Sequence, residues 1–550
     1  MLTKEEIFGY TPVKKYSTSV AYFSMEFAVD QALKIYSGGL GFLAGSHLRS
    51  ACTLKQNLVG IGMLWKYGYY DQVRDLNSAM KAEYTHKFYS FLEDTGIIFP
   101  VEIHSSIVYV KAYLLKPEVF GSAPLFLLTT DIEQNDALSR TITNRLYDSN
   151  ESTRIAQSIV LGTGGAKLLD ILGLSIQVYH MNEGHALPLC FYLHDKFKTL
   201  EEVRKHVVFT THTPEAAGNE EHDIDLLEKM SFFYHLNKDE VRGLLHFEGD
   251  IVNYTLSALR FAKIANAVSV MHGEVSREMW RDYEGICTIE SITNAQNKAY
   301  WCDEALEHAL AEDDDKRLWN RKLAMKQNLF NIVADQSGKL FNPEVLTLVW
   351  ARRFAGYKRA SLLTRHWERF IRIIKNTDQP IQIIWAGKPY PEDYGAIDMF
   401  NDLHWKMLPF KNCTVLTGYE LGLSAALKKG SDIWLNNPKL YREASGTSGM
   451  TAAMNGSINL SIPDGWIPEF ARDGKNCFII EPAPGNLPEH IRDDAEATHL
   501  LDLLENKIIP MYYKQHKKWL QMVKAGMKDI HPAFDSDRMA AEYYTKLFDL

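Results

Sequence analysis

The sequence predicts an α/β protein with two doubly wound domains, each a parallel sheet covered by helices. Short runs of β-branched and aromatic residues recur along the 550 residues, and longer amphipathic stretches separate them. Most of these runs are almost entirely apolar, which is typical of strands buried on both faces of a parallel sheet. The alternation of strands and helices occurs twice, so two domains are indicated.

The individual elements follow from the same pattern. The segment 420–430, ELGLSAALKKG, is typical of the predicted helices, and from about residue 500 the pattern is helical without strands. A charged helical segment, 303–340, separates the two sets, and we place the domain boundary near its end. The predicted strands are residues 20–27, 176–182, 206–213, 346–351, 381–387, 413–418 and 432–437.

Composition excludes several classes of protein. The net charge is -9 and no block of lysine and arginine stands out, which argues against nucleic-acid binding. The six cysteines are scattered without a C-x-x-C pair, so neither a disulfide framework nor a zinc site is indicated. The N-terminal MLTKEEIFGY is charged and no apolar run of about 18 residues occurs, so we expect a cytoplasmic enzyme and no membrane partner.

The first motif is IYSGGLGFLAG, which contains Gly38 and Gly39. A glycine-rich turn at the start of a helix presents backbone N–H groups and the positive end of the helix dipole to an anion. A tight turn that only packs a helix against a sheet would look the same, because such glycine pairs are common.

The second motif is WARRFAGYKRA, directly after a predicted strand. It places four cations, Arg352, Arg353, Lys358 and Arg359, within eight residues. Ligands of doubly wound sheets bind beyond the carboxyl ends of the strands, where cations can hold phosphate. The alternative is a solvated charged face, and the position after a buried strand favours the phosphate site.

The third motif, YREASGTSGMTAAMNG, follows the predicted strand 432–437 and contains Glu443. Its small residues Ser445, Gly446 and Thr447 allow close approach of a phosphate or a sugar. The Glu443 carboxylate can bind hydroxyls or stabilise developing positive charge.

Two histidine motifs also follow strands, HMNEGHA with His185 and FTTHTPEAAGNEEHD with His212. Either imidazole could bind a polar ligand, or could be a buried residue whose hydrogen bonds are all internal. Their spacing matches no compact metal motif, so we predict no metal.

Taken in order, these motifs together with AYFSMEF, YGYYDQ, VMHGEVSREMW, SITNAQ, IWAGKPYPED and DIWLNNP resemble the α-glucan phosphorylase family, in particular its short bacterial branch. The resemblance covers nearly the whole chain. It implies a GT-B fold, in which two Rossmann-like domains enclose the active site. The implied domains are 1–340 on the acceptor side, 341–500 on the donor and phosphate side, and C-terminal helices over 501–550 that pack back across the domains.

The resemblance also implies retaining transfer of glucose on α-1,4-glucans, with an α-glucan or maltooligosaccharide as partner and a homodimer as one oligomeric state. Arg353, Lys358 and Glu443 would be catalytic. The family pattern places Arg353 and Lys358 on the reacting phosphate. The residues implied in donor or phosphate binding are Gly38, Gly39, Asn294, Ser445, Gly446, Thr447 and Thr451, and those in acceptor binding are His185 and His212.

The sequence departs from the family where the chemistry is most distinctive. Phosphorylases carry pyridoxal phosphate on a lysine in a segment that would read EASGTSGMK, and here that position is Thr451. A threonine hydroxyl cannot form a Schiff base with the cofactor aldehyde. Ala295, Asn219 and Ser46 also replace the glycine, histidine and aspartate usual in the family.

Three hypotheses follow. The first is a transferase that uses a nucleotide sugar and has no covalently bound cofactor. In phosphorylases the substrate and the cofactor each supply one of two adjacent phosphates, and a nucleoside diphosphate supplies both by itself. The second is a phosphorylase that releases glucose 1-phosphate with non-covalent pyridoxal phosphate. The third is a catalytically silent glucan-binding homologue. Related retaining GT-B enzymes often carry a second glutamate eight residues after the one that corresponds to Glu443, and in this sequence that position is Thr451. The base, sugar, acceptor, activity and oligomeric state are left open.

Overall fold

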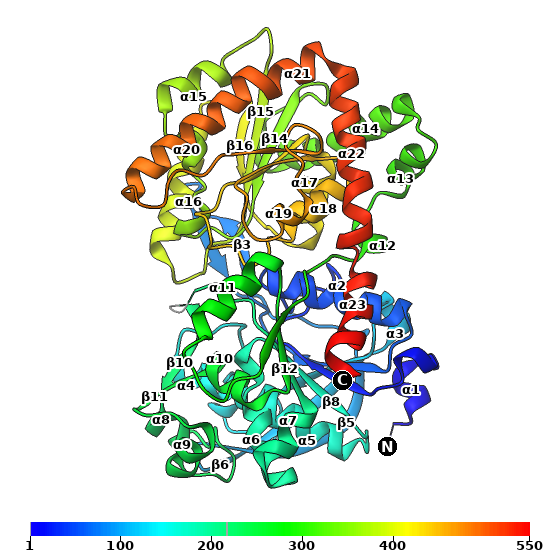
Figure 1. Cartoon of the computed structure of the whole chain (residues 1–550), viewed down its shortest axis with the longest axis vertical. Helices are drawn as coiled ribbons and strands as arrows, with labels where there is room; N and C mark the ends of the chain where they lie inside the picture. The colour runs from blue at the N-terminus through cyan, green and yellow to red at the C-terminus, as the bar shows by residue number, and fades with distance from the viewer. Residues whose placement is uncertain (1, 216–217, 550) are drawn as a thin grey trace. The chain divides into compact units, whose positions relative to one another are not determined.

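The computed structural model describes residues 2–215 and 218–549, so two alanines of the FTTHTPEAAG motif, 216–217, lie outside it. The chain forms two compact units. Unit 1 comprises residues up to 70, residues 84–297 and the chain from 536 onward, and unit 2 comprises residues 71–83 and 298–535. Each unit is an α/β structure with helices around a central sheet (Figure 1).

Unit 1 contains a nine-stranded sheet of order β13-β12-β9-β8-β1-β2-β7-β6-β5. Seven strands are parallel, with Val20 in β1 paired to Leu58 in β2 and to Val178 in β8. At one edge, β6 runs antiparallel to its two neighbours, β7 and β5. The strands are β1 (Val20–Phe23), β2 (Leu58–Met63), β5 (Glu93–Ile103), β6 (Ser106–Leu115), β7 (Leu125–Thr129), β8 (Val178–Asn182), β9 (Val207–Thr210), β12 (Ile264–Ala267) and β13 (Thr288–Ser291).

The helices of unit 1 include α23, near the end of the chain, which lies against α2. They are α1 (Lys4–Phe8), α2 (Gly39–Thr53), α3 (Pro117–Phe120), α4 (Glu151–Ile159), α5 (Gly165–Ile171), α6 (Pro188–Phe197), α7 (Leu200–His206), α8 (Ile224–Lys229), α9 (Lys238–Leu245), α10 (Tyr254–Phe261), α11 (Val270–Trp280) and α23 (Ser536–Tyr543). A small antiparallel pair, β10 (Glu221–Asp223) and β11 (Ile251–Asn253), completes the unit.

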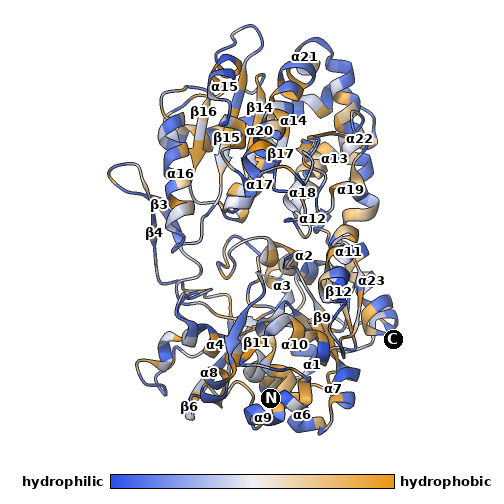
Figure 2. Cartoon of the chain, turned by 60° about the vertical axis from the view of Figure 1, so that its left-hand side comes forward, coloured by the Kyte–Doolittle hydropathy of each residue, from blue (hydrophilic) through white to orange (hydrophobic). Residues whose placement is uncertain are grey.

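Unit 2 contains a six-stranded sheet, parallel throughout, of order β16-β15-β14-β17-β18-β19. Numbered within the unit, this is the order 3-2-1-4-5-6 of the Rossmann fold. Every residue of the central strands is buried, and Figure 2 shows these strands mostly in the hydrophobic colour. The strands are β14 (Leu346–Ala351), β15 (Ile381–Ala386), β16 (Cys413–Leu416), β17 (Ile433–Asn436), β18 (Ile458–Ser461) and β19 (Cys477–Ile479).

The longest helix of unit 2, α14, packs against α17 and is joined to the sheet by a buried ion pair between Lys326 and Asp432. The helices are α12 (Lys298–Trp301), α13 (Glu304–Ala311), α14 (Asp315–Ser337), α15 (Trp367–Ile374), α16 (Tyr394–Met407), α17 (Leu421–Gly430), α18 (Ser448–Met454), α19 (Ile467–Phe470), α20 (Glu489–Leu503), α21 (Ile509–Lys514) and α22 (His516–Phe534).

The predicted α/β class, the parallel sheets and all seven predicted strands are confirmed. The observed units divide the chain differently from the expected boundary at 340, because α12, α13 and α14 pack within unit 2. Unit 2 also takes the hairpin of β3 (Asp71–Arg74) and β4 (Met80–Glu83), where Gln72 bonds Gly387 and Gly418 beyond the ends of β15 and β16. The antiparallel strands β5 and β6 were not predicted, since one face of β5 is open to solvent.

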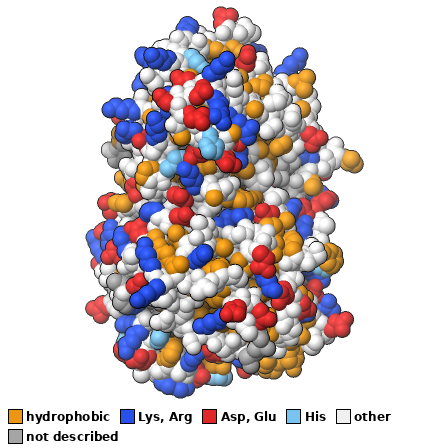
Figure 3. Space-filling view, turned by 90° about the vertical axis from the view of Figure 1, so that its right-hand side faces the viewer, with side chains coloured by type: hydrophobic (Ala, Val, Ile, Leu, Met, Phe, Trp, Pro, Cys, Tyr) orange, Lys and Arg blue, Asp and Glu red, His pale blue; other side chains and the backbone are white. Residues whose placement is uncertain are grey.

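The surface carries no dominant charge on the face that Figure 3 presents, where basic and acidic side chains are intermingled. Among the residues that the structure describes, none of the helices is both long and apolar enough to cross a membrane.

Candidate active site

The site in unit 2 is built where the order of the strands reverses. The strands β14, β15 and β16 follow one another towards one edge of the sheet, and the next strand in sequence, β17, pairs with the other side of β14. In such sheets the loops after the two central strands diverge and leave space for a ligand. Arg352 directly follows β14, and Glu443 lies in the loop after β17. Arg359 links these loops, since its guanidinium donates to the carbonyls of Asn437 at 2.9 Å and Pro438 at 2.7 Å.

Arg352 is a buried cation without a counter-ion among the described residues. Its side chain is 7% exposed, and its Nε and Nη2 atoms have no hydrogen-bond partner. Burial lowers the pKa of Arg352 to about 10. Its backbone is held close to Gly387, where a Cβ would lie 1.8 Å from the Arg352 carbonyl oxygen. An unpartnered guanidinium in such a place is suited to an anion.

Lys358 and Glu443 form an ion pair beside Arg352. Burial and the neighbouring guanidinium groups of Arg352 and Arg353 lower the pKa of Lys358. Arg353 itself is exposed. The structure therefore brings Arg352, Arg353, Lys358 and Glu443 together. Arg352 belongs to the predicted cation cluster, but the resemblance gave the phosphate-binding role to Arg353 and Lys358 and not to this buried cation.

Asp464 fixes the position of the Glu443 loop. It is 3% exposed, and its Oδ2 atom accepts hydrogen bonds from the backbone N–H groups of Arg442 and Glu443, both at 3.0 Å. Its Oδ1 accepts from Gly465 at 2.9 Å. Burial raises the pKa of Asp464 to about 7, against the effect of these hydrogen bonds.

The small residues predicted to contact a ligand lie in the same loop. Ser445 is 6% exposed, and its hydroxyl has no hydrogen-bond partner. Gly446 has a φ of +89°, and a Cβ there would lie 3.2 Å from Glu443 Oε2, so glycine is required for the close approach. Thr447 immediately precedes α18. Thr451, one turn into α18, is fully buried, and its hydroxyl donates to the Ser448 carbonyl at 3.0 Å.

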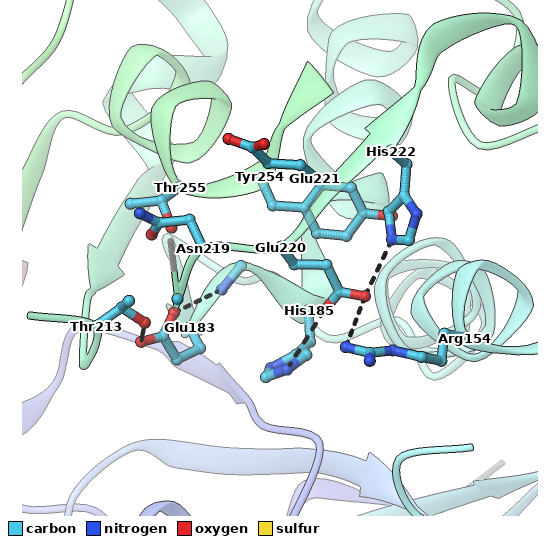
Figure 4. A pocket seen from close by; sticks show the side chains of 12 residues that line it. Arg154, Glu183, His185, Thr213, Asn219, Glu220, Glu221, His222, Tyr254 and Thr255 are labelled. Carbon is cyan, nitrogen blue, oxygen red and sulfur yellow. Dashed lines mark hydrogen bonds and ion pairs between the residues drawn. The ribbon is translucent and has the colours of Figure 1, made fainter. Parts of the chain in front are cut away.

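Unit 1 holds a separate pocket beyond the ends of β8 and β9 (Figure 4). Its volume is about 430 Å³, and its walls include Arg154, Glu183, His185, Glu220 and His222. Glu220 accepts from Arg154 at 2.9 Å and from His222 at 3.0 Å. Burial opposes the charge of Glu220, but its hydrogen bond to His222 and the positive charge of Arg154 lower its pKa to about 2.

Glu183 is the strained residue of this pocket. Its φ is +69°, in the left-handed region that non-glycine residues rarely occupy, at a cost of about 1–3 kcal/mol. Its carboxylate accepts from the backbone N–H of His212, from the Thr213 hydroxyl at 3.2 Å and from its neighbour Gly184 at 3.3 Å. Burial nevertheless raises the pKa of Glu183 to about 7. Strain at a ligand pocket is typical of a functional site.

The two predicted histidines differ in their roles. His185 lines the pocket, and its Nε2 atom lies 4.0 Å from Glu220. His212 bonds Asn182 through Nε2 at 2.7 Å and supports Glu183 through its backbone. Burial lowers the pKa of His212 to about 3, so this imidazole is neutral.

The remaining predicted residues also lie in unit 1. Gly38 precedes α2, and its N–H donates to the buried carboxylate of Glu26 at 3.1 Å, as does that of Ser37 at 2.6 Å. A Cβ on Gly38 or Gly39 would meet nothing within 4 Å, so the turn is open beside this carboxylate. Asn294 is 3% exposed, and its Oδ1 atom has no hydrogen-bond partner. The predicted donor residues are thus divided between the two units.

Comparison with known proteins identifies the family. The sequence is 34% identical to the maltodextrin phosphorylase of Thermococcus litoralis, with 100% of this chain and 72% of that protein aligned. It is 31% identical to the glycogen phosphorylase of Aquifex aeolicus, covering 97% of this chain and 86% of that protein. The chain belongs to the glycogen/maltodextrin phosphorylase family.

This phosphorylase-like protein is a glycosyltransferase, as its family membership shows. An uncharacterized protein of Methanocaldococcus jannaschii is 48% identical, with 96% of this chain and 99% of that protein aligned. No family model matches the sequence.

The family's cofactor does not fit residue 451. The threonine hydroxyl cannot form an imine, and it is already bonded within its own helix. The site residues that sequence reasoning missed are Glu183, Glu220 and Asp464. Glu183 stands directly after a predicted strand, a signal that could have selected it, whereas nothing near Asp464 in sequence indicates its bond to the Glu443 loop.

Proposed function

We propose that this protein transfers glucose from a nucleotide sugar to an α-1,4-glucan without covalently bound pyridoxal phosphate. The observation that carries the proposal is the buried guanidinium of Arg352 beside Lys358, because two of its nitrogens have no hydrogen-bond partner. A phosphate group would satisfy it. The relatives named maltodextrin phosphorylase and glycogen phosphorylase support an α-glucan as the other substrate.

Thr451 cannot bind the phosphorylase cofactor covalently, so in this proposal the donor itself supplies the second phosphate. A nucleoside diphosphate sugar meets this requirement. Arg352, Lys358 and the exposed Arg353 would stabilise the diphosphate as negative charge develops on it. The ion pair of Glu443 with Lys358 would open, so that Lys358 could bind the diphosphate. Glu443 would then accept a hydrogen bond from a hydroxyl of the sugar.

The acceptor would bind in the pocket of unit 1. Glu183, His185 and Glu220 offer hydrogen-bond acceptors and donors of the kind that hold sugar hydroxyls, and Tyr254 adds an aromatic face. In the reaction the bond between the anomeric carbon and the phosphate oxygen breaks. A bond from the same carbon to the acceptor hydroxyl oxygen forms on the same face, and the hydroxyl proton passes to the leaving phosphate oxygen. The configuration of the sugar is then retained.

The third hypothesis, a silent homologue, leaves Arg352 without a role. An unpartnered buried cation lowers the stability of the free protein, and a bound anion accounts for its presence.

The deciding experiment compares two reactions of the purified protein. Maltooligosaccharides would be incubated with uridine, adenosine or guanosine diphosphate glucose, and in parallel with inorganic phosphate and pyridoxal phosphate. We expect α-linked chain extension with at least one nucleotide sugar, and no stimulation by pyridoxal phosphate. Release of glucose 1-phosphate that depends on pyridoxal phosphate would instead establish a phosphorylase with a non-covalent cofactor. Glu443→Gln serves as the inactive control, because it removes the carboxylate but keeps the size of the side chain.

A further inference from the structure

A cluster of three metal-binding side chains lies in unit 2, apart from the residues described above. Cys302 Sγ, a Glu307 carboxylate oxygen and a His531 ring nitrogen lie within 4.8 Å of one another. Glu307 and His531 have side chains 19% and 17% exposed, so an ion could enter from solvent. The sequence spacing gave no indication of this cluster, because His531 is far along the chain from the other two.

We propose that Cys302, Glu307 and His531 bind a divalent transition-metal ion, with zinc as the best match. A thiolate, an imidazole and a carboxylate are all zinc ligands, and three protein ligands leave one position for water. The thiolate excludes magnesium and calcium, which prefer oxygen ligands. Binding of the ion releases the Cys302 thiol proton to solvent. The charges of the resulting thiolate and of the carboxylate together offset the two charges of the ion.

The geometry needs only small side-chain movements. Zinc bond lengths of about 2.0–2.3 Å at tetrahedral angles place the ligand atoms roughly 3.3–3.6 Å apart. His531 Nε2 and Glu307 Oε1 now lie 2.7 Å apart in a direct hydrogen bond, so they would separate by about 0.6 Å to admit the ion. The ring proton would move to Nδ1 of His531, which is buried and has no hydrogen-bond partner.

Neighbouring groups already hold Glu307 and the backbone around Cys302 in place. Lys298 Nζ binds the other carboxylate oxygen of Glu307 at 2.7 Å, which leaves Oε1 for the metal and fixes the orientation of the carboxylate. The neighbours of Cys302 are firmly held. The Trp301 carbonyl accepts from Asn455 at 2.9 Å, and Asp303 forms a two-bond ion pair with Arg321. Ligands on rigid backbone lose little entropy when an ion binds.

The position of the cluster suggests a role for the ion. It joins the segment just after residue 298, where the chain enters unit 2, to the end of α22, just before residue 535, where the chain leaves it. Lys298 N–H donates to Asp535 Oδ1 at 3.3 Å, so the two ends of this stretch are already in contact. A bound ion would cross-link them and make unit 2 more resistant to unfolding.

The test uses cobalt and zinc with the full-length protein. Metal-free protein would be titrated with Co²⁺, and the thiolate-to-cobalt charge-transfer absorption recorded, followed by competition with Zn²⁺. We expect one equivalent per chain, and a higher melting temperature with Zn²⁺. Cys302→Ser should abolish the charge-transfer band, and His531→Gln should weaken binding by at least about tenfold.

Cys287→Ser is the matched control, since Cys287 is another half-buried free cysteine but lies in unit 1. It should bind cobalt like the wild type. Circular dichroism of each variant would separate loss of the site from loss of the fold. The proposal is overturned if the wild type shows no charge-transfer band, or if Cys302→Ser and His531→Gln bind metal as tightly as Cys287→Ser. Glucosyl transfer is measured separately, so failure of this site leaves the proposed function untouched.

Discussion

Replacing Arg352 with methionine should change stability and ligand binding in opposite directions. Methionine has a similar length and no charge, so it can fill the volume of the arginine without needing a partner. Because Arg352 is 7% exposed and two of its guanidinium nitrogens lack hydrogen-bond partners, the free protein maintains an uncompensated buried cation. Replacing buried charges with apolar side chains of similar volume is often neutral or stabilising.

The pKa of Arg352 sets the size of the effect. Burial lowers this pKa from its ordinary value to about 10, which corresponds to lost solvation on the order of 3 kcal/mol, at about 1.4 kcal/mol for each tenfold change in proton affinity. The variant should therefore be as stable as the wild type, or more stable by up to about 3 kcal/mol. Anion binding should weaken by about 1.5–3 kcal/mol, roughly 10- to 150-fold, because charge-assisted hydrogen bonds are lost.

The assay combines denaturant unfolding with calorimetric titration of inorganic phosphate, pyrophosphate and a nucleotide sugar. Arg353→Met is the matched control, since Arg353 is exposed and its loss should not change stability. The reasoning is refuted if Arg352→Met lowers the free energy of unfolding by more than about 2 kcal/mol while anion affinity stays unchanged, because Arg352 would then be a structural residue whose environment is misjudged.

Four further outcomes are expected. The wild type should show no aldimine absorbance that survives dialysis and reacts with borohydride. Thr451→Lys should lower the free energy of unfolding by about 1–3 kcal/mol, because the buried site is overpacked, and should weaken nucleotide binding. Unchanged nucleotide affinity would count against a position of Thr451 beside the donor. Arg353→Ala should weaken donor binding, and intact donor affinity and turnover would remove Arg353 from the site. Asp464→Asn should lower kcat/KM for the donor by on the order of tenfold with the fold intact. The amide has one acceptor oxygen and cannot replace both carboxylate oxygens, of which one accepts from Arg442 and Glu443 in the Glu443 loop and the other from Gly465. Unchanged kinetics would argue against this positioning role. The Glu183 carboxyl keeps its proton up to about pH 7 in the folded protein but releases it near pH 4.5 in the unfolded chain, so its contribution to stability is complete below pH 4.5 and is lost as pH rises towards 7. In Glu183→Gln this pH dependence of the free energy of unfolding should disappear. An identical dependence in both proteins would contradict the assignment.

The sequence by itself determined the elements whose character is local. The strands β14, β15 and β17 are almost wholly apolar because both faces of the parallel sheet are covered, and such runs are visible without neighbours. The cations after β14 and the acid after β17 could be placed at strand ends for the same reason. The sequence alone also excludes a Schiff base at Thr451, since no arrangement in space turns a hydroxyl into an amine.

Only the tertiary structure decided which side chains meet. Arg352 and Arg353 are adjacent and chemically identical, yet one is buried and the other exposed, because the turn after β14 directs successive side chains to different surroundings. The bond from Asp464 to the Glu443 loop and the cluster of Cys302, Glu307 and His531 join segments that are distant in the chain. Sequence periodicity reports which face of an element is apolar, whereas contacts of this kind depend on how strands are ordered in the sheet and where each helix packs.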